Sequence, residues 1–160
     1  MRPFILLLVV SLLGCHPSNS QSQSTNSIST QDGDFKEVNQ IINDFFKKYK
    51  TDGPRKAIDY IFNSSKIKAD KGQLDNLKNK LDSASLLFGN FNSAKKITEK
   101  DVSGDLVLFS YLVKYDQRPI RFTFIFYKPK DNWMLYQFLS DDEVIPELED
   151  AAKIFVIKSL

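Results

Sequence analysis

The chain has 160 residues, of which 22 are Lys or Arg and 20 are Asp or Glu, with a single cysteine and a single histidine. This length fits one domain, and the near balance of charge argues against a nucleic-acid-binding face. One cysteine excludes a disulfide within the chain, and a zinc site would need several cysteine or histidine ligands. The glycines are scattered rather than gathered into a phosphate-binding loop, so we expect no metal and no cofactor.

The N-terminal segment has the layout of a secretory signal. An apolar run extends from Phe4 to Leu13, and it is too short to cross a bilayer, which takes about 20 helical residues. The run ends in the sequence Leu12-Leu13-Gly14-Cys15, which resembles the lipobox of bacterial lipoproteins. The resemblance implies cleavage between Gly14 and Cys15, and a lipid with acyl chains such as palmitate on Cys15. Two or more acyl chains would hold the protein stably at the inner or outer membrane, facing the periplasm or the cell surface.

The next segment, residues 15–33, is rich in serine and glutamine and has almost no large apolar side chain. Such a composition cannot bury enough surface to offset the entropy of ordering, so we expect a flexible tether. The predicted organisation is therefore a signal peptide over 1–14, a lipidated tether over 15–33 and one domain over 34–160. The alternatives are an ordinary secretory signal in which Cys15 is incidental, or an uncleaved helix.

Three helices are predicted at the start of the domain. Apolar residues recur every three or four positions from Asp34 to Lys50, with Asp34 as the N-cap residue. A short second helix begins at Pro54 and a third covers residues 71–88 and ends at Gly89. The third helix is expected to turn six side chains inward, namely Leu74, Leu77, Leu81, Ala84, Leu87 and Phe88.

After Gly89 the apolar period changes to that of strands, which we predict over 91–102, 106–115, 121–128 and 133–139. Short turn sequences separate them, so the strands form an antiparallel meander. A terminal helix is expected near Pro146, with apolar residues Ile145, Leu148, Ala152 and Phe155 and with its acidic residues at the positive end of the dipole.

Three helices followed by a meander whose last strand opens with Lys130-Asp131-Asn132-Trp133 resemble the nuclear-transport-factor-like superfamily. That superfamily includes ketosteroid isomerase and many small bacterial envelope lipoproteins. The resemblance covers about residues 34 to 139. It implies an α+β fold in which three N-terminal helices pack on a curved, cone-like, four-stranded antiparallel meander, to which a C-terminal helix is added here.

Six aromatic residues are expected either to fill this cone or to line a pocket in it for a small apolar ligand: Tyr111, Phe122, Phe124, Phe126, Trp133 and Phe138. Arg118 and Arg121 are candidates for the rim of the cone. There they would orient an anionic ligand or partner, or simply remain solvated.

The predicted function is that of a noncatalytic binding or accessory module of the cell envelope, not an enzyme. One alternative is an isomerase- or hydratase-like enzyme, because ketosteroid isomerase combines a carboxylate base with a tyrosine hydroxyl. Residues of these types here are Asp59, Tyr60, Asp101, Tyr111 and Tyr115. Another alternative is a module that binds a protein, as an inhibitor or assembly factor, and a large exposed apolar patch on the outer sheet face would favour it. A homodimer through the sheet is a related expectation.

Overall fold

The structure is a computed structural model that describes residues 35–64 and 70–158. Within these residues there are four helices and four strands: α1 (Lys36–Asp52), α2 (Pro54–Ser64), α3 (Lys71–Phe88), β1 (Phe91–Val102), β2 (Leu106–Tyr115), β3 (Pro119–Tyr127), β4 (Met134–Asp141) and α4 (Val144–Lys158). The signal sequence, the cleavage site between Gly14 and Cys15, and the tether lie outside the described residues. Their processing and lipidation therefore stay predictions.

The four strands form one antiparallel sheet in the order β1-β2-β3-β4. This arrangement confirms an α+β fold in which three helices precede a meander and a fourth helix follows it. Phe109, Phe124 and Phe138 occupy one row across β2, β3 and β4. β3 begins at Pro119, two residues before the predicted start. Proline lacks the N–H group that a sheet ladder uses, but it is tolerated as the first residue of a strand.

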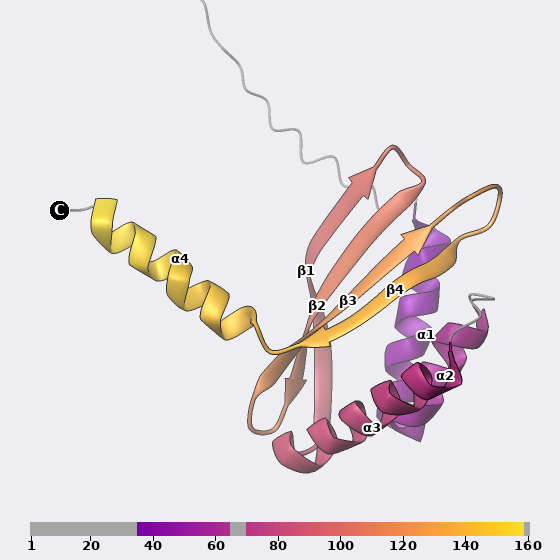
Figure 1. The fold of residues 1–160 in the computed structure, drawn as a ribbon, viewed down its shortest axis with the longest axis horizontal. Coiled ribbons are helices and arrows are strands. Elements are labelled where there is room, and N and C mark those ends of the chain that lie inside the picture. The colour runs from indigo at the N-terminus through magenta and orange to yellow at the C-terminus, as the bar shows by residue number, and fades with distance from the viewer. Residues whose placement is uncertain (1–34, 65–69, 159–160) are drawn as a thin grey trace, which may run out of the picture. The chain divides into compact units, whose positions relative to one another are not determined.

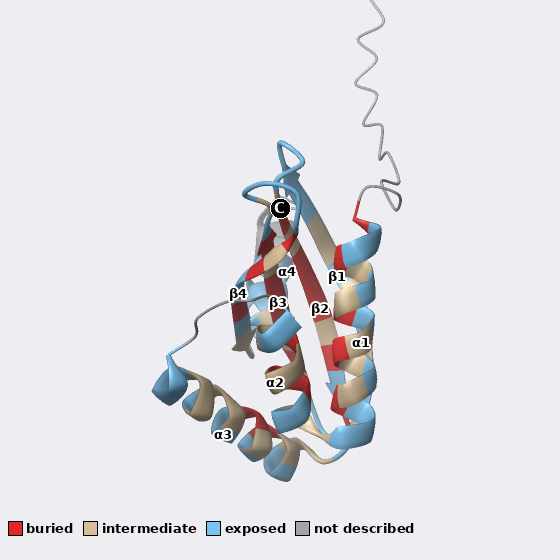
Figure 2. Ribbon diagram, turned by 90° about the vertical axis from the view of Figure 1, so that its right-hand side faces the viewer, coloured by how far each residue is buried: buried red, intermediate tan, exposed pale blue. Residues whose placement is uncertain are grey.

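The first three helices lie on one side of the sheet, and α4 leads away from the end of β4 (Figure 1). Figure 2 shows that the buried residues follow the strands and the helix surfaces turned toward them. α1 buries a stripe of residues with helical spacing, namely Val38, Ile42, Phe45 and Tyr49. α2 adds Ala57, Ile58 and Ile61, and α3 adds Leu81 and Ala84.

Two predicted details of the helices are wrong. The N-cap residue of α1 is Phe35 rather than Asp34, and no side chain of the described residues caps the helix. The ring of Phe35 is buried against Phe109 and Trp133, at centroid distances of 6.0 and 5.6 Å, so the start of α1 is packed into the core. Leu87 is 66% exposed, although we expected it to point inward.

The exposure of Leu87 follows from the position of its neighbour. The ring of Phe88 turns toward Tyr115, with a centroid distance of 6.1 Å. Because consecutive residues of a helix point about 100° apart, Leu87 is then directed toward solvent.

Gly89 joins the helical layer to the sheet. Its φ of +86° is a conformation that L side chains rarely adopt, and its N–H donates to the carbonyl oxygen of Ser85 at 3.2 Å. Beside it, the carboxylate of Asp116 accepts hydrogen bonds from Asn90 N and Nδ2 and from Asn92 Nδ2, at 2.8, 3.0 and 3.0 Å. These donors, the backbone N–H of Asn90 above all, lower the pKa of Asp116. The link fixes where β1 starts relative to α3.

Candidate functional site

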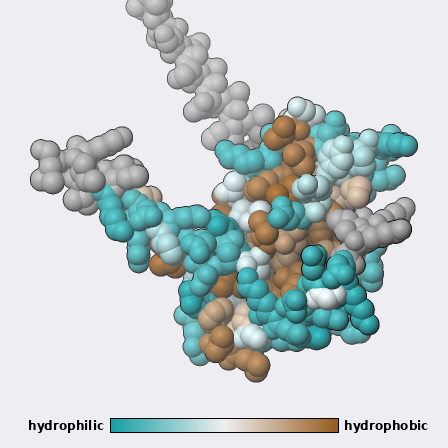
Figure 3. All heavy atoms as spheres, in the orientation of Figure 1, coloured by the Kyte–Doolittle hydropathy of each residue, from teal (hydrophilic) through white to brown (hydrophobic). Residues whose placement is uncertain are grey.

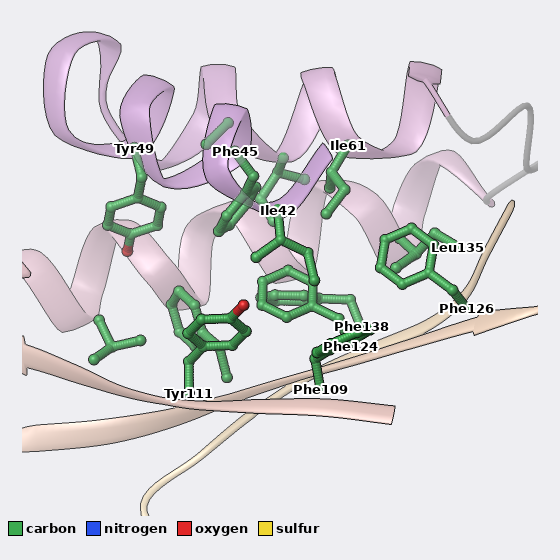
Figure 4. Close-up of a cluster of buried hydrophobic side chains, with 14 of the residues drawn as sticks. Ile42, Phe45, Tyr49, Ile61, Phe109, Tyr111, Phe124, Phe126, Leu135 and Phe138 are labelled. Atoms are coloured by element: carbon green, nitrogen blue, oxygen red, sulfur yellow. The ribbon is translucent and has the colours of Figure 1, made fainter. Parts of the chain in front are cut away.

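The aromatic residues predicted for the cone all lie in the core, each with at most 9% of its surface exposed. The ring of Phe45 from α1 lies 6.2, 5.2 and 5.8 Å from those of Phe122, Phe124 and Phe138. Figure 4 shows side chains from the helices pointing toward those of the strands. The rings meet at tilted and edge-to-face angles, which are the favourable geometries for aromatic pairs. Here the phenylalanines fill the space between α1 and the sheet.

Tyr111 sits at the edge of this core. Burial, and then the negative charge of Glu99, raise the pKa of Tyr111 to about 12. Its side chain also lines a shallow hollow between α1 and β1, together with Asn39, Asn43 and Lys96. Tyr111 therefore packs in the core and also lines a polar hollow at the surface.

The other residues considered for catalysis each have a separate partner. Asp59 forms an ion pair with Lys78 at 2.5 Å, and Tyr60 donates to a carboxylate oxygen of Asp44 at 3.4 Å. The hydroxyl groups of Tyr49 and Tyr115 lie 2.5 Å apart.

Asp101 accepts a hydrogen bond from the backbone N–H of Gly104 at 3.0 Å, in the turn between β1 and β2. The structure therefore distributes these residue types over distinct places instead of gathering them in one pocket.

The two predicted rim arginines both contact the segment that starts α4. Arg121 pairs with Asp141 at 3.0 Å and with Glu147 at 2.7 Å, and these two carboxylates raise the pKa of Arg121. Arg118 pairs with Asp142 at 3.1 Å. In the described residues, Arg121 thus holds the first turn of α4 and Arg118 holds the link that precedes it, so neither stands free at a rim.

The outer face of the sheet, away from α1, carries a group of aliphatic and aromatic side chains that none of the helices in the described residues covers. We call it the outer sheet patch, and it consists of Val102, Leu106, Leu108, Leu112, Ile125, Tyr127 and Leu139, with Ser110 and Thr123 at its centre. Tyr127, Leu139 and Val102 are 41, 43 and 58% exposed. Figure 3 shows hydrophobic side chains gathered over the strands. Exposed apolar patches of this kind mark contact surfaces.

The two polar residues at the centre of the patch satisfy each other. The hydroxyl groups of Ser110 and Thr123 lie 3.3 Å apart on neighbouring strands, and the two residues are only 5 and 8% exposed. In this pair one hydroxyl group donates to the other, so a covering partner would leave at most the second O–H without an acceptor. The patch is suited to being covered.

The sequence contained part of the signal for this patch. Both faces of residues 106–115 are apolar in the sequence, which indicates a strand with two buried faces. Periodicity does not tell which of the two faces the helices cover. The position of α1 over Phe109 and Phe124 decides that, and it leaves Leu108 and Ile125 on the open side.

A second apolar surface lies at the end of α3. A hollow of about 360 Å³ is lined there by Ala84, Leu87, Phe88 and Ile120, and Lys80 closes one side by donating to the carbonyl oxygen of Ser140 at 2.5 Å. Leu86, on the same turn of α3, is 86% exposed. This surface is separate from the outer sheet patch, because Ile120 belongs to the inner face of β3.

In the described part of the chain, no helix is both long and apolar enough to cross a membrane. Comparisons of the sequence and the structure with protein-family models, with curated proteins and with solved structures gave no match.

Proposed function

We propose that the protein is a lipid-anchored protein of the bacterial cell envelope that acts as a noncatalytic module and binds a partner protein through the outer sheet patch. Anchoring through Cys15 is supported by the sequence Leu12-Leu13-Gly14-Cys15 after an apolar run. The patch itself carries the proposal for protein binding. It is apolar and exposed, and its central hydroxyl groups are already paired.

The contrast with the inner face supports a protein partner over a small apolar ligand. On the inner side, Phe45 fills the space above Phe122, Phe124 and Phe138. A small ligand would need a concave site that surrounds most of its surface. The outer side is a sheet face of four strands, and a surface of that shape suits another protein.

Lipidation is tested by metabolic labelling with a palmitate analogue in a bacterial host. We expect label on the wild-type chain and none on the Cys15→Ser variant, which should also be released from the membrane fraction. Equal labelling of the two chains would overturn the anchoring part of the proposal.

Partner binding is tested by placing a photo-crosslinking amino acid at Leu139 in the anchored, full-length protein. Leu86 is the matched control, because it is an exposed leucine on α3, outside the patch. We expect discrete crosslinked species from position 139 that position 86 does not give, and loss of these species when Ile125 is changed to Lys. The same products from both positions would contradict binding through the patch.

A further inference from the structure

α4, like the outer sheet patch, exposes apolar side chains. Ile145 and Leu148 are 41 and 61% exposed, and in sequence the helix continues with Ile154-Phe155-Val156-Ile157. An amphipathic helix normally turns its apolar stripe toward a core. In the described part of α4, no other element buries these side chains. Another apolar surface would have to contact them to bury them.

The start of α4 directs it away from the sheet to which it is attached. Arg121 holds Asp141 and Glu147, and the backbone N–H of Glu143 donates to the carboxylate of Asp141 at 3.2 Å. With its first turn held in this way, the helix runs outward from the end of β4 (Figure 1). The same chain therefore presents an uncovered sheet face and an uncovered helix that do not meet.

The two surfaces are complementary in charge. The segment from Asp141 to Lys153 contains six acidic residues and one lysine. Four of the six already form ion pairs within the described part of the chain, Asp141 and Glu147 with Arg121, Asp142 with Arg118 and Asp150 with Lys153, which leaves Glu143 and Glu149 to face a partner. Three lysines on β1 and β2 point to the outer side of the sheet: Lys95 opposite Leu112, Lys100 opposite Leu108, and Lys114 beside them on β2. None of the three has an ion pair within the described residues, and Glu149 likewise has none. Complementary potentials of this kind fix the orientation in which two surfaces meet.

We infer that the outer sheet patch of one copy receives α4 of a second copy, and that the exchange is reciprocal. This inference rests on the proposed function, because it names an occupant of the same patch. Ile145 and Leu148 of one copy cover Leu108, Leu112 and Ile125 of the other, and the acidic residues of α4 approach Lys95 and Lys100. Each copy uses the same two surfaces, which is the condition for a closed two-fold dimer.

The dimensions of the two elements agree with this arrangement. α4 has 15 residues, which span about 22 Å at the rise of an α-helix. Four strands spaced as in an ordinary sheet are about 14 Å across. One helix is therefore long enough to cross the whole outer face.

The test uses two copies of the full-length chain, differently tagged and expressed together. One carries Leu148→Cys and the other Leu139→Cys, and isolated membranes are treated with a short bismaleimide crosslinker. We expect a covalent product that contains both tags. The control pair, Leu148→Cys with Leu86→Cys, offers an exposed leucine position outside the patch and should give only background product.

Two outcomes would overturn the inference. One is a yield from the Leu148 and Leu139 pair no higher than that of the Leu86 control. The other is a mixed-tag product that does not change when Ile125→Lys is introduced into the patch. If α4 instead lies on lipid, the Cys15→Ser chain would bind zwitterionic phosphatidylethanolamine–phosphatidylcholine vesicles and lose this binding in Leu148→Lys, without any mixed-tag product. That result also overturns the inference.

Failure of the inference is distinguishable from failure of the proposed function. Photo-crosslinking from Leu139 to a different envelope protein, without a mixed-tag product, would refute the second copy as the occupant and retain the patch as a partner site. No patch-specific product in either experiment would refute both.

A charge exchange tests the orientation of α4 on the patch. Lys95→Glu combined with Lys100→Glu should lower the yield of mixed-tag product about threefold at low salt, which is the scale of two exposed ion pairs. Adding Glu149→Lys and Asp150→Lys to the copy that supplies α4 should restore the yield. No change on charge reversal would contradict the orientation proposed here.

Discussion

The two faces of this sheet are built by the same strands but differ in what covers them. Along β3, Phe122, Phe124 and Phe126 point inward and are fully buried, whereas Ile125 between them points outward and is half-buried. The inner rings meet Phe45 of α1 and Phe138 of β4. On the outer side, apolar residues continue across β2, β3 and β4 without a helix above them.

Because of this difference, the inner face stabilises the fold of one chain, whereas the outer face stays accessible to other molecules. Burial of apolar surface contributes about 25 cal/mol per Å², so the covered inner face supplies most of the hydrophobic stabilisation. The outer face contributes less, because its apolar residues stay partly exposed. Changes on the two faces should therefore affect different measurements, namely stability for the inner face and association for the outer face.

The largest effect is expected from a pair of substitutions on neighbouring residues of β3. Phe124→Ala removes a ring that contacts Phe45, Tyr111 and Phe138, and it should lower the free energy of unfolding by about 3–5 kcal/mol. Ile125→Ala, on the outer face, should lower it by less than about 1.5 kcal/mol. Urea unfolding of the two variants measures the difference. Equal losses would show that the outer face is already covered within one chain.

A second pair of substitutions tests the joint that places the helical layer over the inner face. A Cβ atom on Gly89 would lie 2.8 Å from both Cβ and Oδ2 of Asp116, and Gly89 also has positive φ. Gly89→Ala should therefore lower the free energy of unfolding by about 2–4 kcal/mol, through strain and displacement of the carboxylate.

Gly104→Ala is the matched control for this position. Gly104 also has positive φ, +75°, but it has open space around the Cβ position. The expected loss is about 1 kcal/mol, from backbone strain alone. Equal losses in the two variants, measured by thermal or urea unfolding, would argue that the contact with Asp116 does not fix the joint.

The inner face should also make stability depend on pH in the alkaline range. The pKa of Tyr111 is raised to about 12 from the ordinary value of about 10, so the folded state holds the proton more tightly than the unfolded state. Stability is then fully present below about pH 10 and falls as pH rises toward about 12. In Tyr111→Phe, the decrease in the free energy of unfolding between about pH 10 and about pH 12 should be smaller by about 2 kcal/mol. Urea unfolding at a series of pH values measures this.

The matched control for the pH series is Tyr127→Phe, which removes an exposed tyrosine hydroxyl from the outer face of the neighbouring strand. This variant should keep the wild-type pH dependence. Tyr49 and Tyr115 also have pKa values raised by burial, and they account for the part of the fall that remains in Tyr111→Phe. An unchanged pH profile in Tyr111→Phe would mean that its hydroxyl group is well solvated.

Most of the fold could be predicted from the sequence because period and turn residues are local signals. The bounds of α3 and of β1 agree with prediction, since Gly89 separates a period of three to four from a period of two. The details that failed depend on contacts made by distant residues. Asp34 offered a capping side chain, but the helix starts where Phe35 is buried against Phe109 and Trp133.

The candidate site was harder to predict for the same reason. The sequence shows that Leu108 and Phe109 both belong to a strand with apolar faces, but only the position of α1 tells which face stays open. The apolar residues of α4 could be listed from their spacing, but the spacing does not tell whether another part of the chain covers them. Their exposure depends on the ion pairs of Arg121, which join residues 20 or more positions apart.

The smallest effect is expected at Arg121, which connects the outer face to α4. Its ion pairs with Asp141 and Glu147 are partly exposed, so Arg121→Gln should change the free energy of global unfolding by less than about 1 kcal/mol. The start of α4 should nevertheless lose the contacts that direct it, and amide hydrogens near Glu147 should exchange faster with solvent. Hydrogen exchange followed by mass spectrometry measures this, with Lys153→Gln as the control because its pair with Asp150 is local to the helix. If the faster exchange in Arg121→Gln also occurred throughout β3, the arginine would be stabilising the sheet itself. Exchange confined to α4 would show that Arg121 stabilises the start of α4 and leaves the sheet unaffected.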